Sequence, residues 1–474
     1  MEDKPQFNLS EVDLIHSVSE LRALGKSEEF IKAYAKETRD RITWDKPMYP
    51  SGIDRKSIEL LRNKDIFKQI TETELDKTIV GEIEARKVIF LCAQGRLVEN
   101  CQVASYNLLV NSDSGAGKDY VTSKTLEILP IISYIKKTRI SPTAFTYWHN
   151  STFEPDWTWD GKIFYCEDIG EGVLNSEVFK VMCSSGSSAI ITIKQKAVEI
   201  EIKGKPVVIT TTASASPNPE MIRRFVLLQL DESVEQTREI MKRWAEFRKE
   251  GVTPEYNQEL IDAQKFLKRV KVKIPFAELL YKHFPEENVI MRTNFPRFLD
   301  FIAASTAFHQ YQREQDSQGF YLSTGQDYEI AKECFLKLFS NRYMIPLTKN
   351  QKSILSCFET NPYLKGAVMQ LFNTLGIGFI SDRAFETNLK TLARYGILQT
   401  STEKDSLNRD ITAYSLNKSY KINEKLNLPS YEQIIASETS VISETPKKGD
   451  IEDTEDKEVK SSIDETPSIS YEKI

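Results

Sequence analysis

Four short hydrophobic runs alternate with helical stretches between about residue 66 and residue 231. None of the runs alternates strictly between apolar and polar positions, which is typical of strands buried on both faces of a sheet. Strands that alternate with helices in this way predict a parallel sheet covered by helices, so we expect an α/β fold here. The four runs are NLLVN (107–111), KIFYCED (162–168), PVVITTTA (206–213) and FVLLQLD (225–231).

The flanking segments follow other patterns. Residues 1–60 and 254–342 have apolar positions at helical spacing, and residues 346–420 predict three helices followed by two strands. Residues 189–205 alternate more strictly, which predicts a β-hairpin between the second and third hydrophobic runs. From about residue 429 the chain is rich in Ser, Thr, Glu, Asp and Lys, which predicts a solvated, disordered tail.

Composition narrows the protein class without identifying a function. The 474 residues are 40% hydrophobic and 28% charged, which is ordinary for a folded protein. No run of about 18 uncharged apolar residues occurs, and no secretion signal is recognised at the N-terminus. Six cysteines without a CxxC pair and four scattered histidines argue against a zinc module, a disulfide framework or a histidine cluster. We therefore expect a cytoplasmic protein that does not act at a membrane.

The acidity belongs to the C-terminal tail. Residues 429–474 hold 12 Asp and Glu against 5 Lys, which gives −7, whereas the whole chain carries −6. The rest of the chain therefore carries about +1, so only local basic patches could face nucleic acid.

The stretch from Asn107 onward carries the strongest chemical signal. A buried strand is followed by a glycine-containing loop that ends on Lys118, and then by a helix. This is the context of a P-loop, in which backbone N–H groups and a helix N-terminus hold phosphates and a lysine reaches the β and γ oxygens. A glycine-rich turn with an exposed lysine is the alternative. The predicted nucleotide-binding residues are Ser114, Gly115, Ala116, Gly117, Lys118, Asp119 and Tyr120.

Two positions depart from the GxxxxGK[ST] pattern. Ser112 stands where the first glycine is usual, and Asp119 stands where a Ser or Thr usually binds Mg²⁺. A carboxylate at position 119 can hold magnesium directly or through water, but it repels phosphate when the metal is absent.

Polar residues end the second and third hydrophobic runs. Glu167 and Asp168 stand where a pair of carboxylates would serve a P-loop: we assign Glu167 to Mg²⁺ and Asp168 to activation of the attacking water. The alternative is a pair of solvent-facing carboxylates at a strand end. Thr210, Thr211 and Thr212 follow the third run, and a hydroxyl here could bond the γ-phosphate, although threonine also suits strands in general.

Two arginines precede the fourth hydrophobic run. Either Arg223 or Arg224 could reach the γ-phosphate bound by a neighbouring subunit, or could form a local ion pair.

In this order, the motifs resemble those of the AAA+ ATPases. The likeness is greatest to the clade with a hairpin before sensor 1, which includes MCM helicases, superfamily 3 helicases and helicase-like ATPases of phage, plasmid and archaeal mobile elements. SDSGAGKD resembles Walker A, YCEDI resembles Walker B with its acids in reverse order, TTTA resembles sensor 1, and MIRRF resembles the arginine-finger box. By this likeness Arg224 is the better finger, Arg297 is the best sensor 2 candidate, and Arg292 is the second.

The resemblance covers about residues 76–345 and implies a division of the whole chain. The expected regions are an N-terminal helical region (1–60), an AAA+ P-loop ATPase core with a parallel sheet (61–250), a helical lid (251–345), a winged-helix domain (346–420) and an acidic disordered tail (421–474).

Two of these regions could contact DNA. Lys194 and Lys196 lie two apart in the predicted hairpin, which in the resembled helicases projects into the ring channel. Lysines that bind phosphates need no particular base sequence. In the predicted winged helix, the helix that carries Arg383, Lys390 and Arg394 could enter a groove, while Phe385, Leu389 and Leu392 are expected in its core. A solvated hairpin and a protein-docking winged helix are the alternatives.

The resemblance implies an ATP hydrolase that uses Mg²⁺ and acts as an oligomeric ring, expected to be a hexamer. Its function would be that of a DNA helicase or translocase in DNA replication, with DNA as ligand and a primase or other replication proteins as candidate partners. An ATP-switched DNA-binding initiator or loader with little hydrolysis is the alternative, which the altered Walker residues favour. A AAA+ protein that remodels other proteins is a third reading.

Overall fold

A computed structural model provides the structure of the chain. It describes residues 27–29, 31–32, 55–112, 115–142, 145, 158–183, 187–193, 196–212, 224–251, 254–286, 290–339, 347–360, 363–365, 381–404, 408–418, 420–421 and 425–436. Most of the predicted N-terminal helical region, most of the tail, and the candidate residues Ser114, Lys194 and Arg223 lie outside these described residues.

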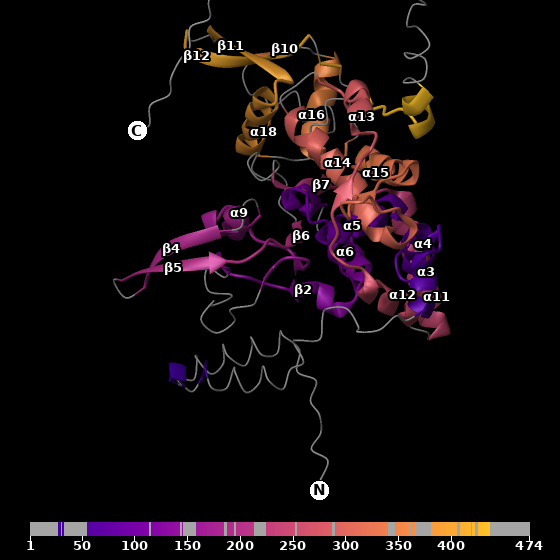
Figure 1. The fold of residues 1–474 in the computed structure, drawn as a ribbon. Helices are drawn as coiled ribbons and strands as arrows, with labels where there is room; N and C mark the ends of the chain where they lie inside the picture. Colours follow the sequence, from indigo (N-terminus) through magenta and orange to yellow (C-terminus); the bar gives the residue numbers. More distant parts are fainter. Residues whose placement is uncertain are drawn as a thin grey trace, which may run out of the picture.

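A five-stranded parallel sheet forms the centre of the fold (Figure 1). Its strands are β1 (Leu108–Asn111), β2 (Tyr134–Lys137), β3 (Ile163–Cys166), β6 (Val207–Thr212) and β7 (Val226–Leu228), in the order β2-β3-β6-β1-β7. The four predicted runs are confirmed as strands. β2 was not predicted, because its YIKK sequence contains two lysines and forms no hydrophobic run.

Successive residues of each strand point to opposite faces of the sheet, so the sheet takes part in two cores. Leu108 and Val110 of β1 belong to the larger core, whereas Leu109 between them belongs to the smaller one. The larger core includes α5 (Ile83–Gln94), α6 (Lys118–Glu127), α12 (Gln258–Ala263), α13 (Ala277–His283), α14 (Met291–Phe308) and α15 (Gly325–Leu338). The smaller core is closed by α8 (Glu171–Leu174) and α9 (Glu177–Met182).

Short N-terminal elements complete the helical layer. They are α3 (Arg55–Leu61), α4 (Ile66–Lys68), η1 (Gln69–Glu74), η2 (Leu75–Lys77), η3 (Gly95–Leu97) and η4 (Val103–Tyr106), followed later in the chain by η5 (Ile131–Ser133), η6 (Gln264–Phe266), η7 (Gln310–Gln312) and the small pair β8 (Val272–Lys273) and β9 (Tyr321–Leu322). Among the described residues, no helix is long and apolar enough to cross a membrane.

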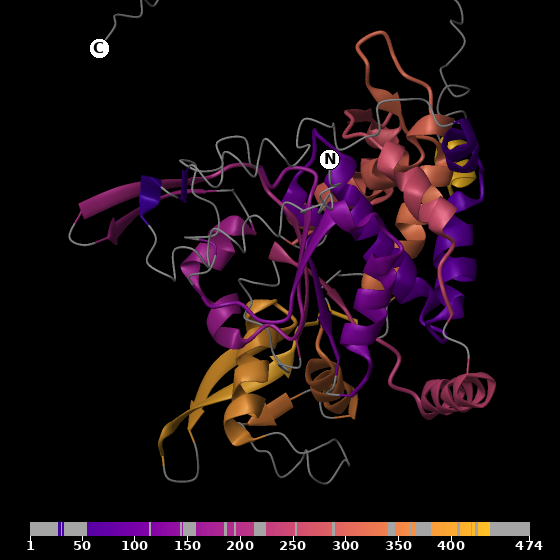
Figure 2. The ribbon, with the colours of Figure 1, turned by 90° about the horizontal axis from the view of Figure 1, so that it is seen from below.

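Two elements extend from this body. The predicted hairpin is confirmed as β4 (Ser187–Ile193) and β5 (Lys196–Ile202), an antiparallel pair that projects away from the sheet (Figure 1). Helix α11 (Val234–Glu250) has no buried residue and lies at the periphery of the molecule (Figure 2).

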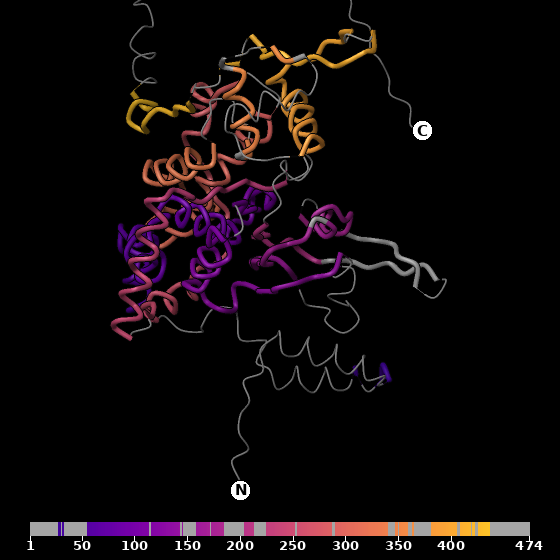
Figure 3. The backbone as a smooth tube through the Cα atoms, turned by 180° about the vertical axis from the view of Figure 1, so that it is seen from behind, coloured from indigo at the N-terminus to yellow at the C-terminus, as the bar shows by residue number. Residues whose placement is uncertain are grey.

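A C-terminal unit with its own core follows α15. It consists of α16 (Lys349–Thr360), β10 (Tyr363–Lys365), α18 (Asp382–Arg394), β11 (Leu398–Lys404) and β12 (Asp410–Leu416), with an antiparallel sheet in the order β10-β12-β11. Phe385, Leu389 and Leu392 are buried in it, which confirms the prediction that they are core residues. The unit lies near α13 and α14 and far from β2 (Figures 1 and 3).

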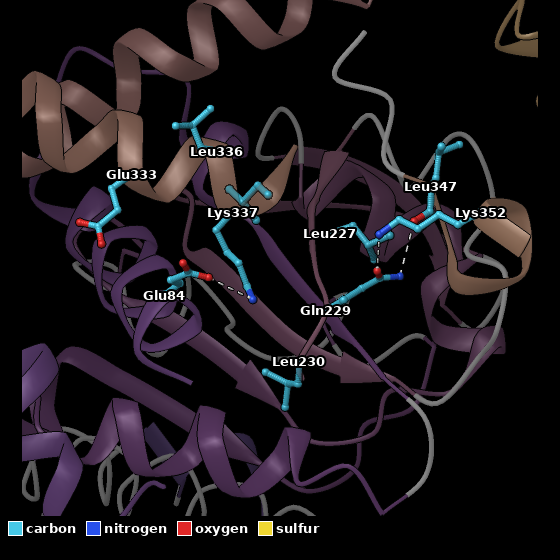
Figure 4. A pocket seen from close by; sticks show the side chains of 10 residues that line it. Glu84, Leu227, Gln229, Leu230, Glu333, Leu336, Lys337, Leu347 and Lys352 are labelled. Carbon is cyan, nitrogen blue, oxygen red and sulfur yellow. Dashed lines mark hydrogen bonds and ion pairs between the residues drawn. The ribbon is translucent and has the colours of Figure 1, made fainter. Parts of the chain in front are cut away.

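A pocket of about 530 Å³, lined by polar groups and by leucines from both sides, lies between part of this unit and the body that contains the parallel sheet (Figure 4). Gln229, just after β7, forms hydrogen bonds with the C-terminal unit. Its Nε2 donates to the Leu347 carbonyl at 3.5 Å, and its Oε1 accepts from Lys352 Nζ at 3.0 Å. Lys337 of α15 pairs with Glu84 of α5 at 3.5 Å in the same cavity. Two hydrogen bonds of Gln229 therefore join the two units beside this pocket, and the partly buried Ile290 packs against the hydrophobic cores of both.

Candidate functional site

The loop after β1 has the backbone that a phosphate-binding turn needs. Gly115 and Gly117 have φ values of +91° and +81°, in the left-handed region that favours glycine. A Cβ atom added at either glycine would meet no heavy atom of the described residues within 4 Å, so backbone conformation rather than crowding requires glycine. Gly117 is the N-cap of α6 and its carbonyl accepts from Val121 N at 2.9 Å. The N-terminus of a ten-residue helix therefore opens directly after this loop.

Lys118 lies between two carboxylates. Its side chain is only 7% exposed, and its Nζ is 3.9 Å from Asp119 Oδ2 and 4.0 Å from Asp168 Oδ1. The two carboxylates are more accessible, at 42% exposure for Asp119 and 66% for Asp168. The structure therefore brings together three residues that the sequence motifs assigned to one site.

Thr211 joins the two carboxylate segments. Its hydroxyl donates to Asp119 Oδ1 and accepts from the backbone N–H of Asp168 at 2.7 Å. This contact is possible because β6 lies between β1 and β3 in the sheet, so its end stands between the P-loop and the carboxylates. Thr212, which is also buried, donates its hydroxyl to the Ile169 carbonyl at 3.5 Å instead. Of the predicted threonines, Thr211 is the one that faces the site.

The backbone at Asp168 is unusual. Its φ of +42° lies in the left-handed region, which costs a non-glycine residue about 1–2 kcal/mol. Thr211 of β6 holds this turn with two hydrogen bonds. Its hydroxyl accepts from Asp168 N, and its carbonyl accepts from Ile169 N at 2.8 Å. The turn therefore fixes Asp168 beside Lys118 through contacts made by its backbone.

Glu167 has a different set of partners from Asp168. Its Oε1 forms an ion pair with Lys136 Nζ at 2.7 Å, and the same ammonium donates to Ser123 Oγ of α6 at 2.8 Å. The nearby Tyr165 hydroxyl donates to the Asp119 carbonyl at 3.3 Å. Burial first, then the negative charges of Glu167 and Asp119, raise the pKa of Tyr165 well above its ordinary value. Glu167 thus lies on the α6 side of the sheet, but Lys136 neutralises it.

Lys136 is a residue that the sequence motifs did not indicate. It comes from β2, whose register places it opposite Tyr165 of the neighbouring strand β3. The signal in the sequence is weak: within YIKK, an apolar residue, Ile135, is followed by a charged one, Lys136. In the structure Ile135 is buried and Lys136 is exposed, as that alternation would suggest.

The donor set fits a magnesium ion that is bound together with phosphates. Among the described residues, no group of three or more His, Cys, Asp or Glu could hold a metal ion by itself. Mg²⁺ usually takes one or two protein carboxylates, with waters and substrate phosphates as its other ligands. Asp119 and the neighbouring Asp168 and Glu167 are such oxygen donors, next to a helix N-terminus. When bound there, the ion would neutralise charge on the phosphates.

Two residues near the start of α6, Ser112 in the loop and Tyr120 in the helix, have partners in other segments. Ser112, which stands for the first P-loop glycine, is buried, and its Oγ accepts from Leu230 N at 3.0 Å, so it ties the loop to the segment after β7. The Tyr120 hydroxyl donates to the Thr78 carbonyl at 3.0 Å, and its ring lies 6.3 Å from that of Trp244 in α11. Tyr120 therefore links α6 to Thr78 and to α11, while its side chain stays partly exposed.

The arginines lie apart from this cluster. Arg224 is half-buried and its Nη1 donates to the Lys180 carbonyl near the end of α9 at 2.8 Å. Arg297 is only 4% exposed, and its Nη1 donates to Asn294 at 3.1 Å. Burial first lowers the pKa of Arg297, to about 10, while the nearby Cys92 and Asp300 raise it. In this conformation the Arg297 guanidinium does not face solvent. Arg292, the second sensor 2 candidate, lies at the start of α14 and is exposed.

The predicted DNA-binding residues of the C-terminal unit lie on the surface. Arg383, Lys390 and Arg394 of α18 are exposed, and Lys390 pairs with Glu386 at 2.6 Å. In the hairpin, Lys196 is the first residue of β5 and pairs in register with Ile193.

Comparison with known proteins agrees with the coarse assignment. One protein family, described as MTBMA_p00010 P-loop domain, matches residues 52–271. That stretch contains the whole parallel sheet and the cluster around Lys118. No curated protein sequence matches the chain. The family match and the five-stranded parallel sheet identify an α/β P-loop fold, and a P-loop domain indicates a nucleotide-binding NTPase.

Proposed function

We propose that the chain is a Mg²⁺-dependent ATPase of the AAA+ type that acts on DNA as a helicase or translocase in replication. The observation that carries the proposal is the convergence of Lys118, Asp119, Asp168 and Thr211 at one edge of the sheet. A lysine, carboxylates and a hydroxyl around a helix N-terminus are the groups that phosphoryl transfer requires for positioning and charge neutralisation.

Each residue has a role in this proposal. The loop N–H groups and Lys118 bind the β- and γ-phosphates, and Asp119 holds Mg²⁺. Asp168 accepts a proton from the attacking water, since its exposed carboxylate lies beside Lys118. Glu167 would be a second magnesium ligand, which requires that its ion pair with Lys136 open.

The proposed action on DNA is supported by the hairpin and the C-terminal unit. The β4–β5 hairpin lies between the carboxylate strand β3 and the threonine strand β6 in the chain and projects from the body (Figure 1). A helix followed by a two-stranded hairpin, as in α18, β11 and β12, supports a winged helix. The packing of α14 and α15 against α5 supports a helical lid.

In the proposed ring, Arg224 would act between neighbouring subunits. A finger must reach a phosphate on the neighbouring subunit, whereas Arg224 Nη1 is bonded to the Lys180 carbonyl of its own chain. We therefore expect subunit assembly to exchange this contact for one with the γ-phosphate.

The test is ATP turnover with and without single-stranded DNA, in the wild type and in Lys118→Ala. Lys124→Ala is a matched control on the same helix, because Lys124 pairs with Glu127 at the far end of α6. We expect DNA-stimulated turnover that is lost only in Lys118→Ala, and strand displacement in a follow-up assay. Turnover that survives in Lys118→Ala would contradict the site assignment.

A second candidate is an ATP-switched DNA-binding initiator or loader that hydrolyses little ATP. The ion pair between Glu167 and Lys136 favours it, because it occupies a carboxylate that catalysis would use. This reading predicts ATP-dependent binding to duplex DNA, measured by fluorescence anisotropy, with negligible turnover whether or not DNA is present. DNA-stimulated turnover would exclude it.

A further inference from the structure

We infer that Asp119 makes ATP binding at this site depend more strongly on a divalent cation than a Ser or Thr at the same position would. This inference rests on the proposed ATP site. It goes further in explaining what the departure from Ser or Thr at position 119 does to nucleotide binding.

The first argument is the charge around the P-loop lysine. Lys118 is buried and has two carboxylates, Asp119 and Asp168, within 4.0 Å of its ammonium. Glu167 is already compensated by Lys136. One positive and two negative charges therefore meet where the phosphates must bind. A Ser or Thr at position 119 would leave this group neutral, and like charges a few ångströms apart repel strongly in a partly buried site.

The second argument is the orientation of the Asp119 carboxylate. One oxygen accepts from the Thr211 hydroxyl, and the other faces the Lys118 ammonium. In this conformation the lysine is the counter-ion of a residue of its own chain. A divalent cation that binds Asp119 would take over that role and release Lys118 for the phosphates.

Thr211 acts as a positioning residue in this arrangement. Its single hydroxyl both donates to Asp119 and accepts from the Asp168 backbone, so it fixes the two carboxylate segments relative to each other. Its removal leaves the negative charges in place but frees their orientation. Thr211→Val should therefore keep the weak binding of metal-free nucleotide and lose part of the gain that the cation provides.

The experiment measures binding of a fluorescent ATP analogue in EDTA and in MgCl₂, so it does not depend on turnover. The variants are Asp119→Ser, Asp119→Asn and Thr211→Val. Glu127→Gln is the matched control, because Glu127 is a carboxylate at the other end of α6 that pairs with Lys124. Circular dichroism confirms that each variant is folded.

For the wild type and Glu127→Gln, we expect the affinity to rise about 100-fold or more when Mg²⁺ is added. Both Asp119 variants should bind metal-free nucleotide about tenfold more tightly than the wild type, and their gain from Mg²⁺ should shrink by a similar factor. By linkage, Mn²⁺ titrated in the presence of the analogue should show the same loss of coupling.

Two outcomes would overturn the inference and are distinct from each other. If Asp119→Ser keeps the full Mg²⁺ gain, or the wild type binds equally well in EDTA, the inference is wrong while the ATP site stands. If folded wild type and Glu127→Gln bind no nucleotide in either condition, the proposed ATP site fails, and the inference fails with it.

Discussion

Replacing the fully buried Asp327 with Asn removes a negative charge from a hydrogen-bonded network between α14 and α15. The Oδ2 atom accepts from Arg313 Nε at 2.7 Å and from Thr324 N at 2.9 Å. The Oδ1 atom accepts from Arg313 Nη2 at 2.8 Å and from Ser305 Oγ at 2.7 Å. The amide nitrogen of Asn would point a donor at one of these donor groups, and it would leave the Arg313 guanidinium, 4% exposed, without its counter-charge.

The expected cost follows from that burial. Breaking a buried ion pair by removing one partner typically costs about 3–5 kcal/mol, out of a total stability of about 5–15 kcal/mol for a domain. Burial alone would raise the pKa of Asp327, but the hydrogen bonds and charges of His309 and Arg313 outweigh it and hold the pKa well below its ordinary value. Asp327 therefore stabilises the fold above its ordinary pKa of 3.8, and this contribution is lost as the pH falls through the depressed pKa.

The assay is hydrogen–deuterium exchange of peptides from α14 and α15, which reports the free energy of opening of this layer. The matched control is Asp262→Asn, an exposed carboxylate of α12 paired with Lys265 at 2.6 Å, whose loss should cost less than about 1 kcal/mol. The additional substitution Arg313→Met should restore part of the loss in Asp327→Asn, because it removes the unpaired charge. A loss below about 1 kcal/mol at pH 7 would refute the reasoning.

Four further predictions test other parts of the molecule. Burial raises the pKa of Asp300 to about 7, so the unfolded chain loses this proton from about pH 3.8 upward while the folded chain keeps it. The free energy of unfolding of the wild type therefore falls as the pH rises from 3.8 to 7. In urea denaturation, Asp300→Asn should become more stable than the wild type over that range, by up to about 4 kcal/mol at pH 8. Arg224→Ala should lower turnover about 10³-fold or more while ATP affinity is kept; full activity in this variant would exclude Arg224 as the finger. Gly117→Ala, at a φ of +81°, should lose about 1–2 kcal/mol in thermal unfolding, from backbone strain rather than from a clash with any of the described residues. Lys196→Ala should reduce the salt dependence of single-stranded DNA binding by about one phosphate contact, and an unchanged slope would exclude that contact.

The sheet and the P-loop were predictable because their signals are local. A strand buried on both faces, such as β1 or β6, must be apolar at successive positions, and the glycines of the loop mark left-handed backbone. β2 escaped prediction because an edge strand needs only one buried residue, Ile135, among polar neighbours.

The side-chain contacts of the candidate residues were less predictable than the helices and strands that carry them. Likeness of motifs assigned Glu167 to the metal and Arg297 to the phosphate, but the positions of these residues depend on what packs beside them. Glu167 meets Lys136 only because β2 lies next to β3, and Arg297 faces Cys92 and Asp300 because α14 is buried among the other helices.

The buried strands, the phosphate-binding turn, the hairpin and the residue types available for chemistry follow from the sequence alone, since hydrophobic pattern and backbone preference act between near neighbours. Which charges meet depends on the tertiary fold. Lys118, Asp168 and Thr211 come from three separate segments, and they converge because the carboxyl ends of parallel strands lie at the same edge of the sheet. Electrostatic and hydrogen-bonding partners depend on distances of a few ångströms, and these are set by strand order and register rather than by position along the chain.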